Sequence, residues 1–68
     1  MALDPDIRIT GTAEESRYDL DGHATREIRV EFFVGKFGPF AERFPKPEFT
    51  RDARDQKLND FARHVRQS

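Results

Sequence analysis

The chain has no cysteine and no long apolar run among its 68 residues. Without cysteine, no disulfide can stabilise the fold, and neither thiolate chemistry nor a cysteine-ligated metal site is possible. The N-terminus lacks the basic region and apolar segment of a signal peptide, and no stretch is apolar enough to cross a membrane. We therefore expect one small domain over residues 1–68, a cytoplasmic location and no membrane contact.

A large excess of charge of one sign is also missing, because the formal net charge is −1. Residues 1–35 hold four basic and eight acidic side chains, whereas residues 36–68 hold eight basic and five acidic ones. Proteins that bind nucleic acid through phosphate contacts usually carry an unbalanced basic field. The overall balance disfavours a nucleic-acid partner, and the −4/+3 division favours docking onto a charged partner such as a second copy.

The large apolar side chains that the chain does contain are densest in residues 26–44, which hold five of its seven phenylalanines. Within residues 27–34, apolar and mostly charged side chains alternate. Successive side chains of a strand point to opposite faces, so this period of two predicts a strand with one apolar face. The residues on that face are Ile28, Val30, Phe32 and Val34.

Asp21-Gly22 is a strong hairpin signal that ends a first strand beginning at Ile7. A three-residue loop, residues 21–23, would pair Leu20 with Ala24 and keep the apolar residues on one face. Ile7 and its neighbour Ile9 then have the wrong parity, which a β-bulge at Gly11 would correct. The polar run 12–16 either continues this strand at a sheet edge or forms a loop.

The second turn is expected to use all five residues from 35 to 39, which would place Val34 opposite Phe40. Val30 would then face Phe44. Pro45 and the proline at position 47 end the third strand, since proline supplies no backbone donor to a sheet.

The only convincing helix spans residues 50–66, with Thr50 as its N-cap. Its apolar residues recur at the spacing of one helix face. They are Leu58, Phe61, Ala62 and Val65. The sequence thus predicts an α+β fold, in which a three-stranded antiparallel β-meander over residues 7–45 packs one face against a C-terminal helix. Residues 1–6 are expected to be flexible.

Neither histidine has a partner at the spacing of a catalytic triad or a metal site: His23 lies in a turn and His64 on the helix surface. The carboxylates lie in open surroundings that give no cause for a raised pKa. We therefore predict no enzyme, no catalytic residues, no cofactor and no metal, and we see no sign of a small-molecule substrate.

A protein-contact surface is the functional prediction that the residues favour. Phe33 points to the charged face of the sheet, and Phe37 lies at a turn tip where phenylalanine has no structural role. With Lys36 nearby, they can form an apolar spot rimmed by charge. The predicted contact residues are Phe33, Phe37, Lys36, Arg29 and Arg43. Alternatively, Phe37 folds back under the sheet edge and Phe33 is a single exposed apolar residue.

These features predict a small non-enzymatic interaction or assembly module, which binds a protein partner or a second copy through this surface, the first strand's edge, or both. Short, charged, cysteine-free chains of this kind are typical of bacterial and phage open reading frames. The alternative is a DNA-binding domain. In predicted topology the chain is similar to the arm-binding domains of some integrases and the plant domains that bind GCC-box DNA, without a shared motif. The acidic residues that alternate with Arg29 disfavour that alternative.

Overall fold

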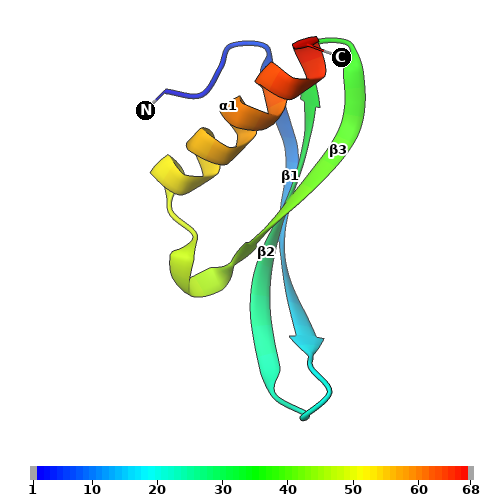
Figure 1. The fold of residues 1–68 in the computed structure, drawn as a ribbon, viewed down its shortest axis with the longest axis vertical. Helices are drawn as coiled ribbons and strands as arrows, with labels where there is room; N and C mark the ends of the chain where they lie inside the picture. The colour runs from blue at the N-terminus through cyan, green and yellow to red at the C-terminus, as the bar shows by residue number, and fades with distance from the viewer. Residues whose placement is uncertain (1, 68) are drawn as a thin grey trace.

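The structure is a computed structural model that describes residues 2–67. Three strands are followed by a short 3₁₀ helix and one α-helix. These are β1 (Ile7–Tyr18), β2 (Ala24–Val34), β3 (Phe37–Pro45), η1 (Lys46–Glu48) and α1 (Arg51–Gln67). The strands pair antiparallel in the order β1-β2-β3, and α1 crosses one face of the sheet at the end away from the β1–β2 loop (Figure 1). The predicted α+β class and strand–strand–strand–helix order are confirmed.

The core lies between α1 and the apolar face of the sheet. It consists of Ile7, Val30, Phe32, Val34, Phe44, Leu58 and Ala62. The Phe32 ring packs edge-on against Phe61 with 5.3 Å between ring centroids, and 5.9 Å separates it from Phe40. The apolar face predicted for the helix therefore packs against the sheet. The predicted N-cap is also present, because the Thr50 hydroxyl accepts the backbone N–H of Ala53 at 3.0 Å.

The first hairpin differs from its predicted register by two residues. Tyr18 pairs with Ala24, so the loop runs from Asp19 to His23, and the predicted three-residue loop is wrong. Leu20 lies in this loop and is fully exposed. A shift of two residues leaves each side chain on its predicted face, because the strand period is two. Asp19 stabilises the longer loop, since its Oδ1 accepts the backbone N–H groups of Asp21 at 3.0 Å and His23 at 2.8 Å.

The predicted bulge near Gly11 is confirmed. Ile9 pairs with Phe32, whereas Gly11 pairs with Glu31, so Thr10 is the additional residue of β1. This extra residue brings Ile7 and Ile9 to the face that α1 covers. The strand then continues through residues 12–16 to Tyr18, so the polar run belongs to a strand at the sheet edge.

The second turn is tighter than predicted. Val34 pairs with Phe37 across Gly35 and the following lysine, and the strand register shifts before Phe32 pairs with Phe40. The predicted five-residue loop is wrong because the φ of Gly35, +57°, allows a two-residue turn, and the irregularity in β3 takes up the remaining residues. Phe40 still faces α1, again because the displacement from the predicted register is two residues.

The N-terminal segment lies against α1. Asn59 accepts the backbone N–H of Asp4 at 2.7 Å, and its own amide donates to the carbonyl of Ala2 at 2.9 Å. Arg66 forms ion pairs with Asp4 and Asp6 at 2.7 and 3.0 Å. These contacts join the part of residues 1–6 that the structure describes to the C-terminal helix. Met1, which also belongs to the segment expected to be flexible, lies outside the described residues.

Candidate interaction surfaces

The outer face of the sheet, opposite α1, carries closely paired charges. Arg17 Nε lies 3.3 Å from Glu27 Oε1, and Arg29 Nη1 donates to Glu31 Oε1 at 2.6 Å. Glu15 Oε1 lies 4.0 Å from Arg29 Nε and accepts no hydrogen bond from the residues that the structure describes. Because each of these arginines has a carboxylate within 4 Å, the face presents alternating charge and not a continuous basic field.

The residues predicted to form one contact surface lie on two faces. Arg29 and Arg43 are cross-strand partners on the outer face, where Phe33 also lies with the Arg8 guanidinium 5.1 Å from its ring centroid. Phe37 pairs with Val34 and therefore shares the face that α1 covers. Phe37 is 48% exposed, and Lys36 Nζ lies 5.7 Å from its ring centroid. The structure thus brings together Arg29 with Arg43, and Lys36 with Phe37.

A projecting hairpin is the largest surface feature that sequence reasoning missed. The last pair between β2 and β3 joins Glu27 to Pro45, whereas β1 and β2 continue to pair up to Tyr18 and Ala24. Residues 16–26, here called the arm, are therefore a two-stranded ribbon with its loop, and every one of them is exposed. The arm extends beyond α1 and gives the molecule its long axis of 39 Å, against 22 and 20 Å across (Figure 1).

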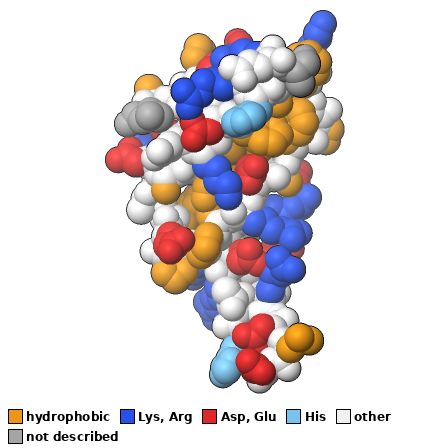
Figure 2. Space-filling view, viewed as in Figure 1, with side chains coloured by type: hydrophobic (Ala, Val, Ile, Leu, Met, Phe, Trp, Pro, Cys, Tyr) orange, Lys and Arg blue, Asp and Glu red, His pale blue; other side chains and the backbone are white. Residues whose placement is uncertain are grey.

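The end of the arm combines apolar and acidic side chains. Tyr18 is 74% exposed and Leu20 is fully exposed, with no core beneath them. Asp19 and Asp21 flank Leu20 in the chain, and His23 Nδ1 lies 3.7 Å from Asp19 Oδ2. The narrow end of the molecule accordingly shows acidic side chains with a histidine and an apolar group beside them (Figure 2).

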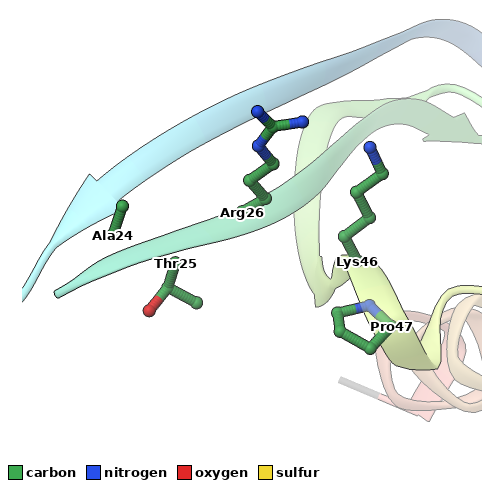
Figure 3. A pocket seen from close by; sticks show the side chains of 5 residues that line it. All are labelled: Ala24, Thr25, Arg26, Lys46 and Pro47. Carbon is green, nitrogen blue, oxygen red and sulfur yellow. The ribbon is translucent and has the colours of Figure 1, made fainter.

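Beside the arm lies an open hollow of about 650 Å³, lined by residues of β2 and η1 (Figure 3). The lining residues are Ala24, Thr25, Arg26, Lys46 and Pro47. Lys46 Nζ contacts Glu14 Oε1 at 2.5 Å, and Arg26 Nη1 lies 3.7 Å from Glu14 Oε2. The hydrogen bond from Lys46 lowers the pKa of the Glu14 carboxyl. The lining of the hollow thus includes two cations and apolar groups, and both cations pair with Glu14, which is not itself a lining residue.

The titratable side chains form no recognisable reaction centre in the described part of the chain. Asp19, Asp21 and His23 each offer one ligand atom within 4.8 Å of the others, but all three are exposed. His64 Nδ1 contacts the Asp60 carbonyl oxygen at 2.8 Å within α1. The one buried carboxylate among residues 2–67, that of Asp55, accepts hydrogen bonds from its neighbour Arg54 at 2.8 and 3.0 Å.

The fold and these surfaces describe a small α+β domain with an open three-stranded antiparallel sheet, one covering helix and a projecting hairpin. Comparison with protein-family models, with curated proteins and with solved structures gave no match. Among residues 2–67, no helix has both the length and the apolar character needed to span a membrane.

Proposed function

We propose that the chain is a small non-enzymatic protein-interaction or assembly module that contacts its partner through the arm. The observation that carries this proposal is the exposure of Tyr18 and Leu20 at the end of a ribbon that has no core beneath it. When a partner covers large exposed apolar side chains, their removal from water contributes favourably to the free energy of binding. Tyrosine is also among the residues enriched at the centres of protein interfaces.

Open strand edges add a second means of contact. Over residues 24–26, β2 pairs with no strand of residues 2–67 on its β3 side, because the last pair between β2 and β3 joins Glu27 to Pro45. The outer edge of β1 is likewise unpaired by any strand of residues 2–67. An extended segment can add to such an edge through backbone hydrogen bonds, while side-chain contacts supply specificity.

The surface predicted from the sequence provides a competing location for the same function. Phe37 and Lys36 project at the β2–β3 turn, at the opposite end of the sheet from the arm. Phe33 lies on the outer face of the sheet, the face that also carries Arg29 and Arg43, and its ring contacts Arg8. Because these sites are separate, single substitutions distinguish them.

The test is affinity capture from cells that express the chain, with partners identified by mass spectrometry and compared across Leu20→Ser, Phe37→Ser and Phe33→Ser variants. We expect a partner that the wild type retains and Leu20→Ser loses, while Phe37→Ser keeps it. Loss with Phe37→Ser or Phe33→Ser and retention with Leu20→Ser would place the contact on the surface predicted from the sequence. Retention by all three variants would overturn the proposal that exposed apolar side chains form the contact.

The same material also tests the DNA-binding alternative, which the paired charges of the outer face do not favour. Fluorescence anisotropy with a duplex oligonucleotide should give weak binding at low salt. Tight binding that falls steeply with salt concentration would support nucleic-acid recognition and contradict the proposed role. The cytoplasmic location, the bacterial or phage origin and the absence of catalysis remain predictions.

A further inference from the structure

We infer that the partner of the arm is a second copy of the chain, with the arm tip of each copy occupying the hollow of the other. This inference rests on the proposed function, and it names the partner. The tip comprises residues 18–21, and the hollow is the one lined by Arg26, Lys46 and Pro47. Both surfaces belong to every copy, so a single pair of molecules satisfies both contacts.

Charge complementarity supports this pairing. Asp19 and Asp21 give the tip two negative charges. The hollow is lined by Arg26 and Lys46, which share a single carboxylate partner, Glu14, outside the lining. The tip therefore carries an excess of negative charge and the hollow an excess of positive charge. Opposite potentials orient two surfaces and exclude wrongly oriented encounters.

The apolar groups also match. Leu20 and Tyr18 are the most exposed large apolar side chains of the described residues, and Ala24 and Pro47 form part of the hollow's wall. In the dimer, the partner would remove Leu20 and Tyr18 from water, which a single copy cannot do. An apolar centre with charged residues around it is the usual arrangement of a protein interface.

The position of the hollow on the arm suits a two-fold arrangement. Ala24 pairs with Tyr18, so the hollow begins directly beside the base of the tip and extends toward η1. A two-fold axis near Thr25 would lay the two arms antiparallel, with Ala24 opposite the partner's Arg26 across the open edges of β2. Each tip would then extend past the axis toward η1 of the other copy, which gives a closed, self-complementary interface.

The contact area is limited to two short arms. Specific interfaces smaller than about 1,200 Å² belong to weak or transient associations. We therefore expect a dimer that forms as concentration rises, and not a permanent one. Since the contact is partly electrostatic, its dissociation constant should increase with salt without the steep dependence seen for nucleic acid.

The experiment is sedimentation equilibrium of the whole chain from micromolar to near-millimolar concentration. The wild type should form a dimer, and Leu20→Ser should raise its dissociation constant about tenfold or more. Phe37→Ser, which alters an exposed apolar residue outside the arm, is the matched control and should leave the constant unchanged.

A mixing experiment tests the tip-to-hollow geometry. Asp21→Lys replaces one of the tip's two negative charges by a positive one and so removes its negative excess. Arg26→Glu gives the hollow a negative excess, so each variant alone should dimerise more weakly than the wild type. In an equimolar mixture one contact between unlike copies joins an unaltered tip to an unaltered hollow, and the other brings the introduced lysine to the introduced glutamate. Dimers should therefore be more abundant in the mixture than in either variant alone. Circular dichroism of each variant confirms that it is folded, and recovery on mixing cannot arise from misfolding.

The outcomes separate this inference from the proposed function. A wild type that stays monomeric throughout, or a mixture that recovers no dimer, overturns the tip-to-hollow dimer. If a different captured protein still depends on Leu20, the arm keeps its role as an interaction surface. A dimer that Phe37→Ser dissociates and Leu20→Ser leaves intact contradicts both the inference and the use of the arm.

Discussion

Arg66, near the end of α1, donates from Nη2 to Asp4 Oδ1 at 2.7 Å and thereby joins the two ends of the chain. The same guanidinium contacts Asp6 Oδ2 at 3.0 Å. The hydrogen bond from Arg66, followed by that from the backbone N–H of Asp6, lowers the pKa of the Asp4 carboxyl. The N-terminal segment is therefore held to the helix by a contact that depends on the ionised form of Asp4.

This relationship predicts a loss of stability in acid. A carboxyl whose pKa is lower in the folded state contributes stability above its unfolded pKa, near 4, and loses it as the pH falls through the folded value. Glu14, whose pKa is lowered mainly by Lys46, acts in the same direction. Urea denaturation followed by circular dichroism should show the free energy of unfolding decreasing as the pH falls below about 4.5. Arg66→Gln should make that decrease smaller, and an identical decrease in the variant would contradict this account.

Substitution by alanine should reduce stability strongly at Leu58 and hardly at all at Leu20. Leu58 is completely buried against the sheet, so Leu58→Ala should cost about 2–5 kcal/mol of unfolding free energy. A single core in a domain of this size supplies only about 3–5 kcal/mol, so the variant should be largely unfolded at room temperature. Leu20→Ala should change the unfolding free energy by less than about 0.5 kcal/mol, because Leu20 is fully exposed. Urea denaturation of both variants is the measurement, and equal losses would contradict the assigned burial.

Gly38 cannot accept a side chain without rearrangement. Its φ is +134°, and a Cβ atom there would lie 2.8 Å from Phe33 Cδ2 and 3.3 Å from the Phe32 carbonyl oxygen. Gly38→Ala should therefore destabilise the fold by more than about 1 kcal/mol in thermal or urea denaturation. Gly11→Ala is the control, since nothing lies within 4 Å of that Cβ position and its φ is not positive. A larger loss at Gly11 than at Gly38 would rule out the steric explanation.

Asp19 should hold the arm's loop in its conformation without contributing much to the stability of the whole fold. Asp19→Ala removes the acceptor of the Asp21 and His23 backbone N–H groups, so these amides should exchange with solvent faster. The change in global stability should be no more than about 1 kcal/mol, because the loop is exposed. Hydrogen exchange followed by NMR is the measurement, with Asp21→Ala as a control that keeps the Asp19 carboxylate. Unchanged exchange at His23 in Asp19→Ala would show that another group holds the loop.

Several elements followed from the sequence because their signals are local. The alternation over residues 27–34 defined both faces of β2, and it placed Phe33 with Arg29 on the outer face. The spacing of Leu58 and Ala62 identified the helix face that packs on the sheet. The mismatch in parity between Ile9 and the later part of β1 was sufficient to predict the bulge, since one inserted residue exchanges the two faces of a strand.

The strand pairings were decided by tertiary structure, because registers that differ by two residues place the same side chains on the same faces. The carboxylate of Asp19 and the positive φ of Gly35 selected among them. The separation of Phe33 from Phe37 then followed, since a two-residue turn pairs Phe37 with Val34. The sequence by itself predicted three strands, the C-terminal helix and the apolar faces that meet in the core, but it left residues 12–16 undecided and assigned residues 37–39 to a loop. The end of β3 at Pro45 also followed from its prolines. Only the tertiary structure decided that Pro45 pairs with Glu27, and hence that residues 16–26 project and that Arg26 and Lys46 line one hollow, because those contacts join segments that no local periodicity connects.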